Sequence, residues 1–295
     1  MVHNVNRLLQ RILGLIVCYL IMLPVYAETT VQILSSRAGD SAELLAYLSK
    51  TFKNDITLIV DEPTVSTNAD LLIVLNNETP NLSAVHPPTL FVLPQPSARE
   101  LQKQDSALYW TPSLAAQLAL IRAMLPATNR VGMLVSNNNE DASWLRVFKQ
   151  YAAEQSIDVR FQTVDKARIA RQVSELAAST DVLLAQPDIE IYNRDTIRFI
   201  LLAAYRQNKV LVGPSPAFIN AGALATLYAP TSVIAEEVAQ KIRYFHKNNK
   251  LPPTSRVKNF SVSLNPQVAK SLGLAVPAMN ELERLLRLEE LPTWP

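Results

Sequence analysis

Few side chains in this sequence of 295 residues could act as catalytic acids, bases, nucleophiles or metal ligands. Beyond residue 27 there is no cysteine, and the two histidines, His86 and His246, have no second ligand at metal-binding spacing. Asp188 and Glu190 follow a predicted strand, but one intervening residue does not fix the distance between their carboxylates. The sequence contains no G-x-S-x-G, H-E-x-x-H, phosphate-binding loop or G-x-G-x-x-G motif. We therefore expect no enzyme, no cofactor and no metal site.

Ligand binding is the chemistry that the sequence favours instead, because polar residues follow several apolar runs. In open parallel sheets, ligands bind outside the carboxyl ends of the strands. The alternative is that these residues are ordinary surface loops, which are polar everywhere. The predicted strand ends are Ser35-Ser36-Arg37, Leu93-Pro94-Gln95, Ser136-Asn137-Asn138, Gln186-Pro187-Asp188 and Gly213-Pro214-Ser215.

The elements that must position these residues are short apolar strands alternating with amphipathic helices. Continuous apolar runs are typical of parallel strands buried on both faces. Alternation of such strands with helices predicts an α/β protein with parallel sheets, and a seam at residues 126–129 predicts two similar lobes. The predicted strands are 30–36, 56–60, 69–75, 89–93, 130–136, 157–164, 181–186, 209–213, 223–230 and 257–265. The predicted helices include 111–125, with Pro112 in its first turn, and 231–247.

Residues 1–27 have the organisation of a secretory signal peptide. Basic residues without any acidic one precede an apolar run from Ile12 to Leu23, and small residues lead to Ala27. A membrane anchor is the alternative, but this run is shorter than the roughly 20 residues that a span requires. We expect cleavage after Ala27 and a periplasmic protein.

The charge balance excludes some classes of partner. The chain has 28 basic and 26 acidic side chains, and residues 1–27 contain two arginines and no acidic residue. The remainder is therefore neutral and has no basic block, which argues against nucleic acid as a partner.

Four stretches between Arg130 and Pro277 occur in a characteristic order. They are "RVGMLVSNNNEDASWLRVFKQYAAEQSIDV", "STDVLLAQPDIEIYN", "NKVLVGPSPAFINAGALATL" and "NFSVSLNPQVAKSLGLAVP". Together they resemble the second half of ABC-transporter substrate-binding proteins of the periplasmic-binding-protein type I class, in the subgroup that includes aromatic amino-acid binders. The similarity extends back to about Pro112. The resemblance implies an α/β fold of two Rossmann-like lobes with parallel sheets joined by a hinge. It places lobe 1 at 28–128 plus 228–258, lobe 2 at 129–227 plus 259–277, and a C-terminal amphipathic tail at 278–295.

The resemblance also implies a set of ligand contacts. In the second lobe these are Ser136, Asn137, Asp188, Tyr192, Ser215, Ala223 and Tyr228. Tyr192 is either a ring that stacks on the ligand or an ordinary surface tyrosine. Gly213 and Gly222, two of only six glycines, are expected in tight turns that border this cleft.

The first half departs from the family pattern, with "SSRAGDSAELL" and "LPQPSARE" at the places of its usual motifs. Ser36 and Arg37 are the candidate contacts there, and Arg37 either pairs with a ligand carboxylate or is a solvated loop residue.

The resulting expectation is a monomeric exported protein that binds a small molecule, an amino acid or small carboxylate, for an ABC permease. The alternative is a degenerate binding-protein fold that serves a membrane partner as a sensory or interaction module, without transport. The C-terminal helix, with Leu282, Leu285, Leu286 and Leu288 on or near one face, is expected to dock on its own lobe.

Overall fold

The computed structural model describes residues 29–35, 38–52, 56–60, 65, 68–75, 86–96, 101–136 and 143–288. The expected signal peptide lies outside these residues. Within the described part, no helix is both long enough and apolar enough to span a membrane.

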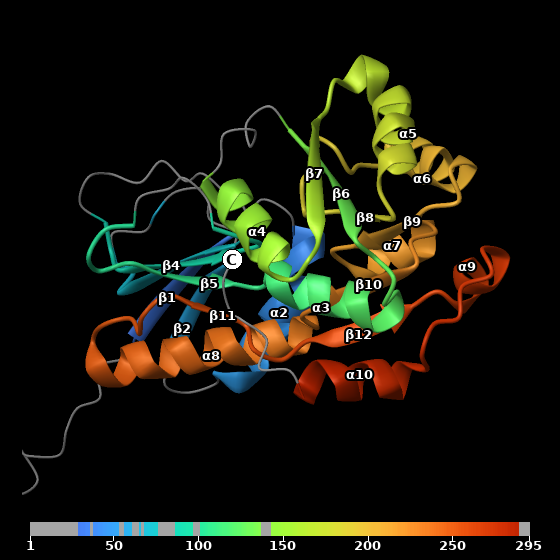
Figure 1. The fold of residues 1–295 in the computed structure, drawn as a ribbon. Helices are drawn as coiled ribbons and strands as arrows, with labels where there is room; N and C mark the ends of the chain where they lie inside the picture. The colour runs from blue at the N-terminus through green and yellow to red at the C-terminus, as the bar shows by residue number, and fades with distance from the viewer. Residues whose placement is uncertain are drawn as a thin grey trace, which may run out of the picture.

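The first lobe is built on a parallel six-stranded sheet in the order β11-β5-β4-β3-β1-β2 (Figure 1). Helices α2 and α8 pack against one another and, together with the inward residues of this sheet, form its main core. Every residue of β3 and β4 is buried, as the continuous apolar runs predict for strands covered on both faces. The strands are β1 (Thr29–Leu34), β2 (Ile56–Val60), β3 (Leu71–Leu75), β4 (Thr89–Leu93), β5 (Ser106–Tyr109) and β11 (Ser255–Arg256), and the helices are α2 (Ala38–Thr51) and α8 (Thr231–Asn248).

The second lobe has a six-stranded sheet in the order β12-β10-β9-β8-β6-β7. Its first five strands in the chain pair in parallel, and β12 alone is antiparallel, to β10. The strands are β6 (Arg130–Val135), β7 (Asp158–Thr163), β8 (Val182–Leu184), β9 (Val210–Gly213), β10 (Ala225–Tyr228) and β12 (Ser261–Leu264). The helices are α3 (Leu114–Met124), α4 (Ser143–Glu154), α5 (Ile169–Ser179), α6 (Ile197–Arg206), α7 (Pro216–Ala221), α9 (Pro266–Ser271) and α10 (Met279–Leu288).

The described chain crosses between the two sheets three times, through residues 110–113, 229–230 and 257–260. Two strands beside these crossings, β5 and β11, were not predicted from the sequence. The first lobe was expected to include residues up to 128, yet α3 packs in the core of the second lobe against α4 and α10. The reason is that α3 is apolar over most of its surface and is covered from several sides.

Local chemistry accounts for how α3 begins. The Ser113 hydroxyl accepts a hydrogen bond from the Ala116 amide at 3.1 Å, so Ser113 is the N-cap. Pro112 therefore precedes the helix rather than lying in its first turn.

The two glycines of the α7 region serve different purposes. A Cβ on Gly213 would lie 2.4 Å from the Cβ of Phe218, so glycine is required because α7 packs directly over the end of β9. Gly222 follows α7 with a φ of 120°, a conformation that side-chain-bearing residues rarely adopt. Gly222 is a turn position, as expected, whereas Gly213 is the last residue of β9, paired with Thr226, and is fixed by packing rather than by backbone angle.

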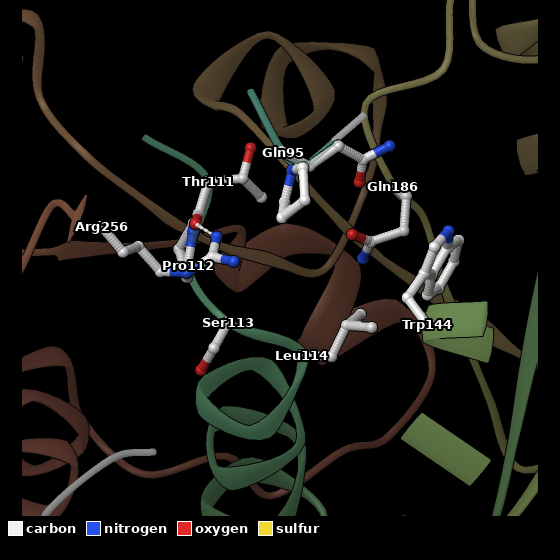
Figure 2. A pocket seen from close by; sticks show the side chains of 9 residues that line it. Gln95, Thr111, Pro112, Ser113, Leu114, Trp144, Gln186 and Arg256 are labelled. Carbon is white, nitrogen blue, oxygen red and sulfur yellow. Dashed lines mark hydrogen bonds between the residues drawn. The ribbon is translucent and has the colours of Figure 1, made fainter. Parts of the chain in front are cut away.

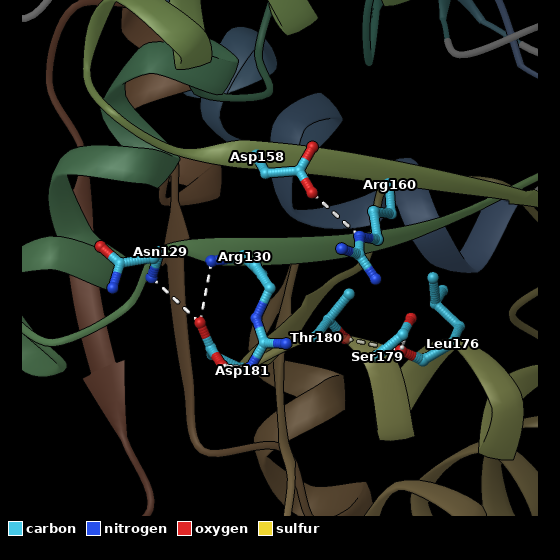
Figure 3. A network of polar contacts seen from close by, with 8 residues as sticks. All are labelled: Asn129, Arg130, Asp158, Arg160, Leu176, Ser179, Thr180 and Asp181. Atoms are coloured by element: carbon cyan, nitrogen blue, oxygen red, sulfur yellow. Dashed lines mark hydrogen bonds and ion pairs between the residues drawn. The ribbon is translucent and has the colours of Figure 1, made fainter.

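A carboxylate fastens the second sheet at the edge remote from the carboxyl ends of its strands (Figure 3). Asp181 Oδ2 accepts from the amides of Asn129 and Arg130 at 3.0 and 2.8 Å, and its Oδ1 lies 2.7 Å from Arg130 Nη2. Burial alone would raise the pKa of Asp181, but these hydrogen bonds outweigh it and lower the pKa. The contact ties the start of β6 to the start of β8.

The C-terminal helix α10 docks on its own lobe, against α3 and β12. Leu282 and Leu286 are buried in the second lobe's core. Leu285 is half-buried.

Candidate ligand-binding site

A small cavity lies between the two lobes, at the carboxyl ends of β4, β5 and β8 (Figure 2). Both lobes contribute side chains, and the first crossing segment forms part of the wall. The cavity has a volume of ≈ 40 Å³. Its lining residues are Gln95, Pro96, Thr111, Pro112, Ser113, Leu114, Trp144, Gln186 and Arg256.

Arg256 supplies the positive charge of this cavity. The register of β11 against β5 places Arg256 beside Tyr109, and its Cζ lies 5.6 Å from the centre of that ring. Its Nη1 donates to the carbonyl oxygen of Thr111. Burial lowers the pKa of Arg256, although arginine remains charged. A partly dehydrated guanidinium at a cavity wall attracts an anionic group strongly.

Thr111 lines the same wall, and its hydroxyl is buried without a partner in the described part of the chain. The residue is 1% exposed, and its Oγ1 has no hydrogen-bond partner among the described residues. A buried hydroxyl without a partner costs about 1–3 kcal/mol, so such groups usually meet a ligand or an ordered water. Ser113, by contrast, uses its hydroxyl to cap α3.

Two buried amides form a chain behind the cavity. Gln186 Nε2 donates to Gln117 Oε1 at 2.9 Å, and Gln117 Nε2 donates to the carbonyl oxygen of Pro112 at 2.9 Å. Gln186 is 7% exposed and Gln117 2%. The chain joins the loop after β8 to the segment where the polypeptide first crosses between the lobes.

The remaining lining is apolar and comes from opposite sides. Pro96 follows β4 in the first lobe, whereas Trp144 lies on α4 in the second. Figure 2 shows Arg256 and Gln186 extending toward the space from opposite sides, with Trp144 beyond Gln186. The arrangement offers one cation, amides and an aromatic ring to a small polar molecule.

Three of the sequence-predicted contacts, Ser36, Arg37 and Asn137, lie outside the described residues. The other six do not line this cavity. Ser136 is buried at the end of β6, and Tyr228 is half-buried at the end of β10.

The structure brings three of the predicted residues into one region of the second lobe. Asp188 and Tyr192 share the turn after β8, in which the Tyr192 amide donates to the Asp188 carbonyl oxygen at 2.7 Å. The Tyr192 ring meets Phe218 of α7 edge to face, with 5.6 Å between ring centres. Ser215 is the N-cap residue of that same helix. Burial, and then the charge of Asp188, raise the pKa of Tyr192.

Ala223 is fully buried in the core of the second lobe. Its amide donates to the carbonyl oxygen of Phe218 at 2.8 Å, which fixes the turn into β10. Neither observation tests a ligand contact, so the role of Ala223 remains a prediction.

The residues that line the cavity were only partly visible in the sequence. Gln95 and Gln186 belong to the predicted strand ends, although neither was predicted as a ligand contact. Arg256 was missed because β11 has only two residues and no hydropathy pattern of its own. Thr111 was missed because it was assigned to a helix, whereas it belongs to the crossing segment.

Neither histidine contributes to this site. His246 lies in the last turn of α8, where its Nδ1 is 2.7 Å from the hydroxyl of Thr29. His86 Nδ1 lies 2.8 Å from the carbonyl oxygen of Pro87. His246 therefore connects α8 to β1, whereas His86 bonds within its own loop.

A family model described as "ABC transporter substrate binding protein" matches residues 111–283, more than half of the chain. The chain belongs to the ABC transporter substrate-binding protein family. The matched segment contains the first crossing from Thr111 onward, the whole second sheet, α8 and β11. It therefore includes every lining residue of the cavity except Gln95 and Pro96. No curated protein sequence matches the chain significantly.

Several solved structures share the fold of this ABC transporter substrate-binding protein at low sequence identity. A conserved domain protein from Vibrio cholerae has a TM-score of 0.64 at 18% identity, over 88% of this chain and 98% of that one. An ABC domain in complex with L-Trp from Streptococcus pneumonia has a TM-score of 0.62 at 16% identity, over 88% and 98%. A ligand-free, open substrate binding protein with adhesive properties from Clostridium difficile has a TM-score of 0.65 at 17% identity, over 85% and 96%. The two-lobed α/β fold expected from the sequence is confirmed.

Proposed function

We propose that this protein holds a small molecule in the cavity between its lobes and delivers it to an ABC importer. One observation carries the proposal: the half-buried Arg256 and the amide of Gln186 line one interlobe cavity at the carboxyl ends of the strands. Membership of the substrate-binding family supports a small-molecule ligand and a membrane permease as partners.

The ligand we propose is an amino acid or a small carboxylate. Arg256 is suited to a carboxylate, because a planar guanidinium binds its two oxygens together. Trp144 offers an apolar ring to the rest of the molecule. The similar structure from Streptococcus pneumonia, which is a complex with L-Trp, supports an amino acid. The sequence-predicted contacts remain part of the proposal as second-lobe residues that a larger ligand would reach.

Entry of such a ligand requires the lobes to separate. A volume of ≈ 40 Å³ is far below the roughly 300–1,000 Å³ of ordinary ligand pockets. The three crossing segments are the only described connections between the sheets, so opening would rotate the lobes about them. We propose that the lobe boundaries lie in these crossing segments, near residues 110–113, 228 and 258, so that α3 moves as part of the second lobe.

Export to the periplasm and a monomeric state complete the proposal. The signal-like residues 1–27 and the family support export. The chain from Glu28 onward is then the form that binds ligand.

The test is a thermal-shift screen of the chain from Glu28 against amino acids, small carboxylates, nucleosides and sugars. A ligand at 100 times its dissociation constant stabilises the folded state by about 2.7 kcal/mol, which raises the melting temperature by roughly 5–10 °C. We expect a hit among the amino acids or carboxylates, and we expect Arg256→Met to abolish its shift. Arg160→Met is the matched control, because Arg160 is exposed and lies on β7, away from the cavity.

A flat response from folded protein would refute transport of these solutes. It would instead favour the second candidate, a degenerate fold that serves a membrane partner without transport. If a ligand stabilised wild type and Arg256→Met equally, the protein would still bind a solute, but at a site other than this cavity.

A further inference from the structure

The amide chain behind the cavity fixes which atom of Gln186 faces the ligand. A glutamine amide has a donor end and an acceptor end of nearly equal size, so its orientation must be deduced from its partners. Here the deduction starts at the Pro112 carbonyl oxygen, which can only accept a hydrogen bond. Gln117 must therefore direct its NH₂ group toward Pro112, at 2.9 Å.

The orientation of Gln117 in turn fixes that of Gln186. With its NH₂ on Pro112, Gln117 presents its Oε1 to Gln186, so Gln186 must direct its own NH₂ toward Gln117, at 2.9 Å. The carbonyl oxygen of Ala185, 3.3 Å from Gln186 Nε2, demands the same orientation. The Oε1 of Gln186 is left on the side of the cavity, and among the described residues it has no hydrogen-bond donor.

We infer that Gln117 is a positioning residue that holds Gln186 with its acceptor oxygen toward the cavity, so that the site selects ligands bearing an N–H or O–H donor beside their anionic group. The inference rests on the proposed function and narrows the class of ligand that the site should bind. Arg256 would donate hydrogen bonds to the anionic group at one side of the space, and Gln186 would accept a hydrogen bond at the other (Figure 2). A carboxylate with an ammonium, amide or hydroxyl group satisfies both, whereas a plain carboxylate leaves Gln186 unsatisfied.

The first experiment needs no ligand. In ¹H–¹⁵N spectra, the side-chain NH₂ of Gln186 should exchange with solvent at least 10-fold more slowly than that of Gln95. Gln95 is a suitable comparison because it lines the same cavity and is only half-buried. Gln186→Met assigns the signal by its loss. Equal exchange of the two groups in the wild type would overturn the inference, since the Gln186 NH₂ would then face the cavity.

The second experiment uses matched pairs of ligands that differ in the donor: L-phenylalanine with 3-phenylpropionate, L-leucine with 4-methylpentanoate, and L-glutamate with glutarate. For a pair that binds, calorimetry should give the wild type a preference of about 10-fold or more for the amino acid. Gln186→Met should remove this preference by weakening the amino acid alone. Gln117→Met should reduce it in the same direction and speed exchange of the Gln186 NH₂, although residue 117 does not line the cavity.

Two controls separate the inference from the proposed function. Arg256→Met should weaken both members of a pair equally, and Gln240→Met, at an exposed position of α8, should change neither. Equal wild-type affinity for both members, or a preference that Gln117→Met leaves intact, would overturn the inference and leave solute binding standing. Binding of no probe would count against the proposed function, while the ligand-free exchange measurement would still decide the orientation of Gln186.

Discussion

Replacing Asp181 with asparagine should show how strongly one carboxylate fastens the second sheet. The asparagine side chain would keep an oxygen for the two backbone amides that Asp181 now accepts at 3.0 and 2.8 Å. It would lack the charge, and its NH₂ would replace the oxygen that lies 2.7 Å from Arg130 Nη2. Hydrogen bonds to charged groups contribute about 1.5–3 kcal/mol each, and partial exposure reduces the loss to roughly 1–2 kcal/mol.

The effect should depend on pH in a defined direction. Because the pKa of Asp181 is lowered in the folded state, its contribution is complete above the unfolded-state pKa of about 3.9. The contribution is lost as the pH falls through the folded-state pKa. The stability difference between wild type and Asp181→Asn should therefore be largest at neutral pH and should shrink toward pH 3.

Urea unfolding at pH 7 and at pH 3 measures the loss of unfolding free energy and its dependence on pH. In thermal unfolding at pH 7, the melting temperature of Asp181→Asn should be lower by about 2–8 °C. Asp158→Asn is the matched control, because Asp158 also pairs with an arginine but is half exposed and lacks such backbone bonds. It should cost less than about 0.5 kcal/mol. Equal losses in the two variants, or a loss at Asp181 that does not change with pH, would refute the reasoning.

Two further substitutions test packing. Gly213→Ala should destabilise the protein by about 1–3 kcal/mol, because its Cβ would overlap Phe218. The effect should exceed that of Gly273→Ala. A Cβ at position 273 would meet nothing within 4 Å, and the φ of 64° there carries only a backbone cost of ~1 kcal/mol. Thermal unfolding of the two variants decides the order, and the reverse order would contradict the packing argument. Leu282→Ala should cost about 2–5 kcal/mol in urea unfolding, because Leu282 is fully buried where α10 meets α3. A loss below about 0.5 kcal/mol would mean that α10 does not dock as described.

The fold was largely predictable because its central strands carry their own signal. The runs that became β3 and β4 are apolar at almost every position, and a strand covered on both faces needs that composition. The short edge strand β11 lacks such a signal, since two residues cannot show a period. Its place is set by pairing with β5, about 147 residues earlier in the chain, as in the bond from Ala107 to Thr254.

The site was harder to predict because long-range contacts place several of its residues. A local rule, the carboxyl end of a parallel strand, placed Gln95 and Gln186 at the predicted cleft edge without marking either as a ligand contact. Arg256 is brought there by a long-range strand pairing, and Gln117 by a helix that the sequence assigned to the other lobe. Neither residue stands in a recognisable motif, so only the assembled backbone reveals them.

The threefold crossing of the chain has a consequence for biosynthesis. The first sheet begins at Thr29 but gains its last strand only at Arg256, and α8, which supplies much of its core, is made just before. Lobe 1 cannot complete its core until the chain has been made as far as Arg256, and distant pairings of this kind form slowly. A nascent chain with this connectivity stays incompletely folded until then, and the proposed export would need an unfolded chain of this kind.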